Sequence, residues 1–275
     1  MSIVKHQDLG VLAGPVLLFG GPYSNLQAFE ALIGAAQGLD IPASRMICTG
    51  DVVAYCGDPS TTVEAVRQAG IALVAGNCEK QLAAHALDCG CGFDAGTTCD
   101  LLSAGWYNVA NAQVTQSQRD LMGAAPDIIS FTHDGQRFAV IHGGITDIAR
   151  FIWPTSAGHV FEGEWNAVEA AIGPVDGIVA GHSGIPFTRD CAKGRWNNAG
   201  VIGMPPHDGG QQTRFAVLDQ GQVTFHTLDY DVDGAVHAMV QAGLTQGYHE
   251  ALRSGYWPSE DVLPPDLRRS TLASG

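Results

Sequence analysis

Short apolar runs alternate with helix-like patterns over the first 80 residues, and this alternation constrains the fold more than any other feature of the sequence. Apolar runs at 16–19, 45–48 and 71–75 predict strands, and residues 26–38 and 59–69 between them predict helices. Strands that alternate with helices in this way form a sheet whose outer face the helices cover.

The rest of the chain contains a helical stretch and then further strands. Residues 80–127 are predicted to form a helical insertion, and residues 232–275 a C-terminal helical tail with a proline-containing end. The remaining predicted elements are a short helix at 165–172 and strands at 128–132, 137–142, 177–180, 215–219 and 222–229.

Charge and hydropathy narrow the possible partners. The formal net charge is −14, which argues against binding to a nucleic-acid duplex, because such binding needs a positively charged surface. No apolar run reaches the 18 or so residues of a membrane span. Residues 10–20 resemble the core of a weak signal peptide. However, Lys5 is the only lysine or arginine before them, and no small-residue cleavage site follows.

The seven cysteines are an odd number without the spacing of a disulfide framework. We therefore predict reduced thiols and a cytoplasmic location. A zinc site is the alternative, but no Cys-x-x-Cys pair supports it; its cysteines would be Cys78, Cys89, Cys91 and Cys99.

Metal-binding side chains follow four of the predicted strands, each beside a glycine. They are Asp51 in "CTGDVV", Asn77 in "VAGNCE", His142 in "VIHGG" and His182 in "VAGHSG". The carboxyl ends of neighbouring strands meet at one crevice, so these residues can converge. One carboxylate, one amide oxygen and two imidazoles suit one divalent transition metal such as Mn, Fe, Co, Ni or Zn.

Taken one at a time, these signals have ordinary structural explanations. A histidine at a strand end is more often a hydrogen-bonded structural residue than a ligand, and a Gly-Asp pair after a strand is commonly a turn. Four such residues in this order favour a metal site.

In motif order the sequence resembles the calcineurin-like metallophosphoesterases, in particular their short bacterial phosphodiesterase and phosphatase branch, from about residue 16 to about residue 231. The family order is Asp-x-His, Gly-Asp, Gly-Asn-His/Cys-Asp/Glu, Val-His-Gly and Gly-His-x-His. The corresponding stretches here are "GPY" at 21, "GD" at 50, "GNCE" at 76, "IHG" at 141 and "GHSG" at 181. The flanking stretches "SNLQAFEAL" and "NNAGVIG" are also similar to the family.

This resemblance implies an α/β fold: a two-sheet β-sandwich flanked by helices on both outer faces, in a single domain over residues 1–275. It also implies that one of the family's two metal sites is missing. Gly21, Tyr23 and Gly184 stand where the family places three ligands of its first metal. The second set is complete, and consists of Asp51, Asn77, His142 and His182.

The resemblance also implies roles at the reacting centre. Asp51 and His142 would carry catalysis together with Cys78, which stands where many relatives have a general-acid histidine. The expected substrate contacts are Tyr23, Asn25 and Asn198. Trp106, Tyr107 and Trp153 are expected to pack the helical section rather than to cover a ligand as an aromatic lid.

The predicted function is that of a metal-dependent phosphoesterase, a phosphatase or phosphodiesterase. It would hydrolyse a small phosphorylated substrate, with one metal site and reduced activity. One alternative is a catalytically silent relative that binds a phosphorylated ligand or a protein partner. Another is that Asn25 and His207 rebuild the first site. The sequence leaves the substrate, the metal and the oligomeric state open.

Overall fold

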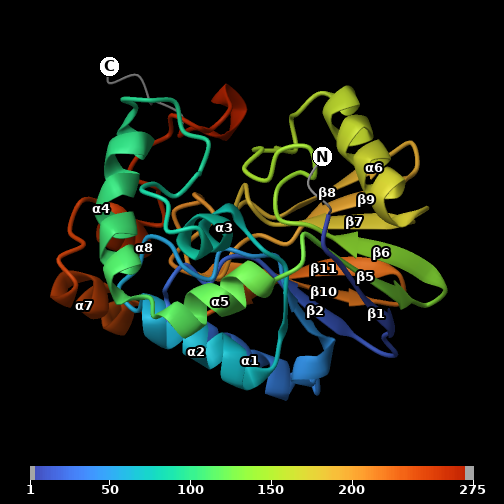
Figure 1. Ribbon diagram of the computed structural model, residues 1–275, viewed down its shortest axis with the longest axis horizontal. Helices are drawn as coiled ribbons and strands as arrows, with labels where there is room; N and C mark the ends of the chain where they lie inside the picture. The colour runs from blue at the N-terminus through green and yellow to red at the C-terminus, as the bar shows by residue number, and fades with distance from the viewer. Residues whose placement is uncertain (1–3, 270–275) are drawn as a thin grey trace.

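The computed structural model describes residues 4–269, which form two mixed β-sheets packed face to face (Figure 1). The six strands of one sheet are, in spatial order, β1 (His6–Val11), β5 (Ile128–His133), β6 (Gln136–Val140), β7 (Gly177–Ala180), β9 (Gly194–Asn198) and β8 (Phe187–Cys191). The five strands of the other are β11 (Gln222–Leu228), β10 (Thr213–Asp219), β2 (Val16–Phe19), β3 (Met46–Cys48) and β4 (Ala72–Leu73). The expected two-sheet α/β architecture is confirmed.

The central strand β2 shows why its sequence is apolar throughout. Val16 and Leu18 point between the two sheets, whereas Leu17 and Phe19 point outward into the helical layer. All four side chains are 0% exposed. A strand buried on both faces has no polar alternation, and the apolar run at 16–19 is typical of this.

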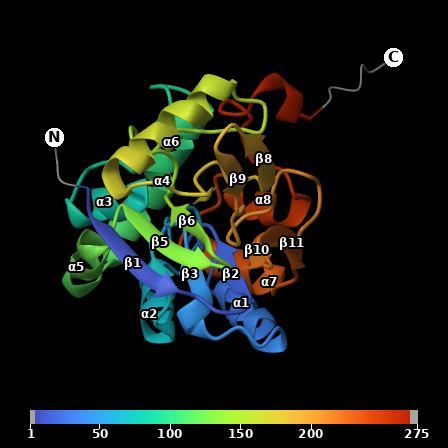
Figure 2. The ribbon, with the colours of Figure 1, turned by 90° about the vertical axis from the view of Figure 1, so that its right-hand side faces the viewer.

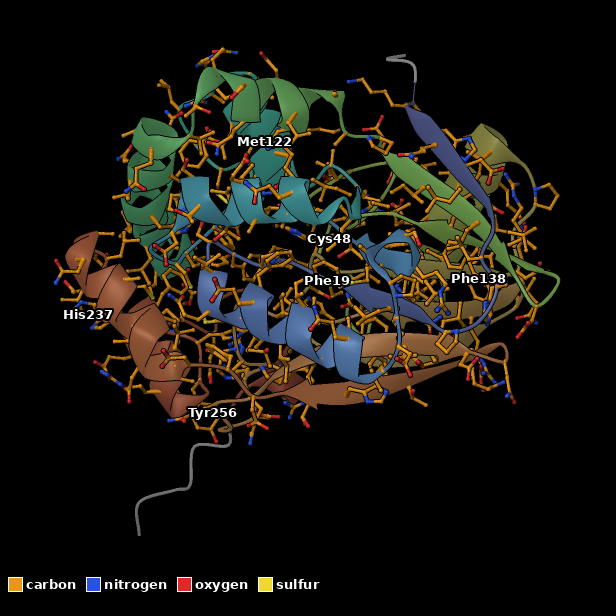
Figure 3. All side chains as sticks on the ribbon, turned by 90° about the horizontal axis from the view of Figure 1, so that it is seen from below. Phe19, Cys48, Met122, Phe138, His237 and Tyr256 are labelled. Atoms are coloured by element: carbon orange, nitrogen blue, oxygen red, sulfur yellow. A yellow bond between two sulfur atoms is a disulfide. The ribbon has the colours of Figure 1, made fainter. Side chains whose placement is uncertain are left out.

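Helices cover the outer face of each sheet (Figure 2). Two of them, α1 (Leu26–Gly38) and α2 (Pro59–Ala69), lie over the five-stranded sheet, where they enclose Phe19 and Cys48 (Figure 3). The opposite sheet is covered by α6 (Gly158–Ile172). The C-terminal helices are α7 (Val232–Gln241) and α8 (Tyr248–Ser254), and the short 3-10 turns are η1 (Ala43–Arg45) and η2 (Pro265–Leu267).

The predicted helical insertion contains three helices: α3 (Asn77–Ala83), α4 (Thr98–Gln113) and α5 (Gln116–Ala124). The buried Arg119 joins them, since its guanidinium donates to the Leu82 and Asn111 carbonyl oxygens. Trp106 and Tyr107 are buried within this section, as expected. After α8 the chain returns to it, where the Thr98 amide donates to Asp261 at 2.9 Å.

Three strands and half of one helix were not predicted. β1 is an exposed edge strand, and β8 and β9 form a hairpin with several polar and charged residues, so none of the three carries a strong apolar pattern. The helix predicted at 165–172 begins earlier, at Gly158, as α6. Across residues 4–269, no helix combines the length and the apolar character needed to cross a membrane.

The layer between the sheets is expected to be the main source of stability. Leu18→Ala leaves a cavity there and should lower the free energy of unfolding by about 2–5 kcal/mol. Leu87→Ala is the matched control, because Leu87 is 91% exposed and its truncation should change that free energy by less than about 0.5 kcal/mol. Urea unfolding measures both; equal losses would contradict this assignment of the core.

Candidate metal centre

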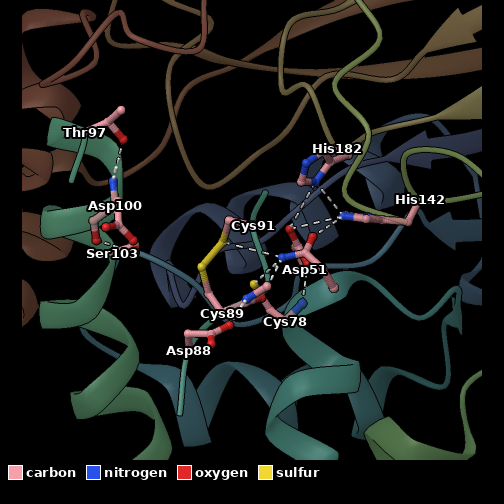
Figure 4. Close-up of a disulfide and its surroundings, with 12 residues drawn as sticks. Asp51, Cys78, Asp88, Cys89, Cys91, Thr97, Asp100, Ser103, His142 and His182 are labelled. Atoms are coloured by element: carbon pink, nitrogen blue, oxygen red, sulfur yellow. Dashed lines mark hydrogen bonds and ion pairs between the residues drawn. A yellow bond between two sulfur atoms is a disulfide. The ribbon is translucent and has the colours of Figure 1, made fainter. Parts of the chain in front are cut away.

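Loops that follow strands of both sheets bring four polar side chains together, and Figure 4 shows Asp51, His142 and His182 pointing toward one another. Asp51 follows β3 and Asn77 follows β4 in one sheet; His142 follows β6 and His182 follows β7 in the other. All four side chains are buried, with exposures between 1% and 7%. The residues named from the strand-end pattern are therefore neighbours in space.

Glycines let these loops approach one another closely. A Cβ atom on Gly50 would lie 2.6 Å from the Gly76 nitrogen and 2.9 Å from Nδ1 of His142. A Cβ atom on Gly76 would lie 2.2 Å from a carboxylate oxygen of Asp51. Real Cβ atoms do not come so close to backbone or ligand atoms, so the two positions require glycine.

The polar atoms of the cluster are spaced as ligands of one ion would be. Nε2 of His142 lies 2.9 Å from Oδ1 of Asn77, 2.9 Å from Nδ1 of His182 and 3.3 Å from Oδ2 of Asp51. Ligand atoms about 2.0–2.2 Å from a shared cation are separated by roughly 3.0–3.5 Å. Asp51, His142 and His182 also form a group whose ligand atoms all lie within 4.8 Å of one another.

The hydrogen bonds around the cluster turn acceptor atoms inward. Nδ1 of His142 lies 2.7 Å from the Thr49 carbonyl oxygen, which can only accept, so that nitrogen carries the hydrogen. The Asn77 amide nitrogen donates to the Cys89 carbonyl oxygen at 2.9 Å, which turns Oδ1 toward His142. With a neutral His142, the carboxylate, the amide oxygen and the free imidazole nitrogen all present lone pairs to one point, an arrangement that a cation stabilises.

The ionisation of the cluster also indicates a place for positive charge. Burial raises the pKa of Asp51, but the charge and hydrogen bond of His142, the charge of His182 and the Cys78 amide together outweigh burial, and the pKa lies below its usual value. Burial lowers the pKa of His142, yet Asp51 raises it above the ordinary value. Burial and the charge of His142 lower the pKa of His182 to about 3. The cluster of buried polar atoms thus accepts one positive charge, from a proton or a metal ion.

Glu79 supports the candidate centre through hydrogen bonds, and the strand-end pattern missed it. Its fully buried carboxylate accepts hydrogen bonds from the backbone amides of Asp51 at 2.7 Å, Val52 at 2.8 Å and Gly76 at 2.8 Å. These bonds tie the loop after β3 to the start of α3, and they hold Asp51 in a left-handed conformation with φ of +58°. The available signal was a glutamate in the helix-starting stretch "GNCE".

Aromatic rings lie beside the glycines at two of the positions assigned to the lost first site. A Cβ atom on Gly21 would lie 2.2 Å from the ring of Tyr23, so that ring occupies the space into which a side chain at 21 would extend. Tyr23 itself is 6% exposed and has a positive φ of +54°. A Cβ atom on Gly184 would lie 3.5 Å from the indole of Trp257.

A pocket opens beside His182. Its lining is mainly aromatic and apolar. Besides His182, the lining consists of Tyr23, Tyr55, Phe93, Cys99, Phe151, Ser183, Gly184, Met204, Tyr248, Trp257, Pro258, Ser259 and Val262. Phe151 lies against the His182 ring, with centroids 4.5 Å apart. Trp106, Tyr107 and Trp153 are not among the lining residues described here.

Other predicted site residues lie outside this lining. Asn25 is fully buried; its oxygen caps α1 through Ala28 and its nitrogen donates to the Gly203 carbonyl. Asn198 donates to the Ser183 hydroxyl at 2.8 Å and thereby fixes a residue that does line the pocket.

His207 and Cys78 also lie apart from the pocket lining. His207 is bonded to Glu260 and Trp257, and is outside the group of candidate ligands found in residues 4–269. Cys78 is 1% exposed beneath the metal centre, and burial followed by the charge of Asp51 raises the pKa of its thiol.

The prediction that all cysteines stay reduced is wrong for one pair. Cys89 and Cys91 form a disulfide next to Asn77 (Figure 4). Gly90 between them has a φ of +59°, a conformation that lets the chain turn back within two residues. The zinc alternative loses these two thiols as ligands. Disulfides are rare in a reducing cytoplasm, so the cytoplasmic location stays a prediction.

Comparison with known proteins identifies solved structures that share the fold of this chain. No protein-family model and no curated protein sequence matches the chain. Among solved structures, a metallophosphoesterase from Sphaerobacter thermophilus aligns with a TM-score of 0.67 and 20% identity, covering 89% of this chain and 100% of that one. A hypothetical protein from Pyrococcus horikoshii OT3 aligns with a TM-score of 0.71 and 16% identity, covering 90% and 99%.

A putative diadenosine tetraphosphatase gives a TM-score of 0.50 at 14% identity, covering 82% of this chain and 99% of that one. The chain therefore has the fold of the calcineurin-like metallophosphoesterases, and the resemblance seen in the sequence motifs is confirmed at that level.

Glu79→Gln tests the support of the metal centre. A glutamine has one acceptor oxygen in place of two, and its NH2 group faces a backbone N–H that needs an acceptor. Loss of such an outer partner typically costs about 10–100-fold in metal affinity, so we expect that decrease for Mn²⁺ in calorimetric titration. Glu30→Gln on the exposed face of α1 is the control and should leave the affinity unchanged. An unaltered affinity in a folded Glu79→Gln protein would contradict the assignment.

Proposed function

We propose that this chain is a metal-dependent phosphoesterase with one divalent cation held by Asp51, Asn77, His142 and His182. The observation that carries the proposal is the convergence of carboxylate, amide and imidazole acceptors at separations of 2.9–3.3 Å around Nε2 of His142. The metallophosphoesterase fold supports it. The cation's identity is left to experiment, since this ligand set suits several transition metals.

The residues around the centre have distinct roles in this proposal. A divalent cation would supply Lewis acidity and positive charge toward a phosphoryl group. Asp51 is its charged ligand, and the Asn77 and His142 contacts fix the ligand geometry. Ser183 lines the adjoining pocket; because its oxygen accepts from Asn198, its own hydroxyl hydrogen is free to donate to a substrate oxygen.

The aromatic rings beside Gly21 and Gly184 support a one-cation centre with reduced activity. Tyr23 occupies the space beside Gly21, and Trp257 lies against Gly184. Two-metal hydrolases stabilise the attacking and the leaving oxygen with separate ions, and one ion supplies half of that charge. The two basic side chains nearest in sequence to the motif loops form ion pairs elsewhere: Lys80 pairs with Asp127, and Arg150 pairs with Glu164.

One observation favours the second candidate, a silent relative that binds a phosphorylated ligand without turnover. Cys78, which stands at the general-acid position of the resembled family, is buried and is not among the pocket-lining residues of the described chain. Its raised thiol pKa also makes it a weak proton donor near neutral pH.

Hydrolysis of bis(4-nitrophenyl) phosphate with added Mn²⁺ separates the two candidates. His142→Ala removes a ligand at the centre of the cluster, and should lower kcat/KM by more than about 100-fold, since loss of an outer partner alone costs about 10–100-fold. His159→Ala, on the exposed surface of α6, should retain the wild-type rate. If all three proteins gave the same background rate while the wild type bound Mn²⁺, the silent-relative candidate would replace the phosphoesterase.

A further inference from the structure

We propose that the aromatic pocket beside His182 binds an uncharged aromatic ester group of a phosphodiester monoanion. This inference rests on the proposed function and specifies its substrate class. Four kinds of observation carry it: the chemistry of the pocket walls, the way one wall is fixed, the filled first site and the charge near the cation.

The walls of the pocket are aromatic and continue into a rigid aromatic cluster. Tyr55 packs edge-on against Tyr23 with centroids 4.8 Å apart, and its ring lies tilted against that of Tyr248 with centroids 4.4 Å apart. On the opposite side Phe93 stacks on Phe151 at 6.1 Å, and Phe151 in turn contacts His182. Flat aromatic groups gain most from such walls, through both area burial and ring–ring contact.

Trp257 presents only its ring surface to the pocket because its polar groups are already bonded. Its indole N–H donates to the Pro205 carbonyl oxygen at 2.8 Å, and its backbone N–H donates to Nδ1 of His207 at 2.9 Å. His207 is held from its other nitrogen by Glu260 at 2.8 Å. The segment after α8 is thus fastened over the pocket with an apolar face inward.

The pocket is bounded by two of the positions assigned to the lost first site. Tyr23 and Gly184 both line it, and they stand where the resembled family has ligands for its first metal. In this chain the same volume is bounded by the Tyr23 ring and by Trp257. The space beside the candidate metal centre therefore has apolar walls in this chain.

Charge near the cation selects a monoanion. With Asp51 as the one charged ligand and neutral histidines, a divalent ion leaves a net charge of about +1 on the ligand set, and the buried Glu79 carboxylate beside Asp51 lowers the local charge further when it is ionised. No lysine or arginine lines the pocket within residues 4–269. A phosphodiester carries one negative charge and matches this set, whereas a monoester dianion would leave one charge uncompensated in an apolar site.

Calorimetric titration of the Mn²⁺-loaded protein with three ligands tests the inference without relying on turnover. Diphenyl phosphate should bind at least about 10-fold more tightly than diethyl phosphate, because burial of one aromatic group is worth that factor. It should also bind more tightly than the dianion phenyl phosphate. Equal affinities for diphenyl and diethyl phosphate, or tightest binding of phenyl phosphate, would overturn the proposal.

Pocket variants connect that preference to the named walls. Trp257→Leu and Phe93→Leu should each reduce the diphenyl phosphate preference at least about threefold, while the affinities for Mn²⁺ and diethyl phosphate stay unchanged. Phe225→Leu, on the exposed face of β11, is the matched control and should keep the full preference. Two variants are used so that a folding defect in one leaves the test intact; an undiminished preference in the folded variants would overturn the proposal.

The two proposals fail in different ways. Aromatic-dependent binding without hydrolysis would remove the phosphoesterase and leave the pocket assignment standing. Hydrolysis that depends on His142, with equal binding of aromatic and aliphatic diesters, would support the phosphoesterase and remove the pocket assignment.

Discussion

The candidate metal centre depends on the hydrogen bonds that the buried carboxylate of Glu79 accepts. This carboxylate accepts hydrogen bonds from the backbone amides of Asp51, Val52 and Gly76, and so joins the loops that follow β3 and β4. Burial, followed by the charge of Asp51, raises the pKa of Glu79 to about 7, and the three amide hydrogen bonds compensate part of that cost. This bridge fixes the backbone of Asp51 at a positive φ, and the Cys78 amide, which donates to Oδ1 at 3.2 Å, helps to orient its carboxylate.

The same end of the sandwich carries aromatic side chains at the positions that the resemblance assigns to a first metal site. Where the resembled family has ligands for a first metal, this chain has glycines at 21 and 184, with the rings of Tyr23 and Trp257 beside them. The Tyr23 ring occupies the space beside Gly21, and the Trp257 ring gives the pocket an apolar wall beside Gly184. The cation centre and the aromatic pocket are therefore parts of one arrangement, which share His182 as their common wall.

The sequence predicts the parts of this arrangement that local pattern encodes. Asp51 and His142 each follow an apolar strand, and the rule that strand ends share an edge brings them together. The contribution of Trp257 was not predictable, because it depends on how the tail returns over the site through His207. The Cys89–Cys91 disulfide carried no signal either, since the seven cysteines of the chain are an odd number and fit no framework spacing.

The most direct measurement is anomalous diffraction from crystals soaked in Mn²⁺. A single peak within about 2.0–2.3 Å of Asp51, Asn77, His142 and His182, with the ring of Tyr23 still beside Gly21, is the predicted result. No peak among these four side chains, or a second peak where the Tyr23 ring lies, would contradict the account of one retained cation site beside a filled one.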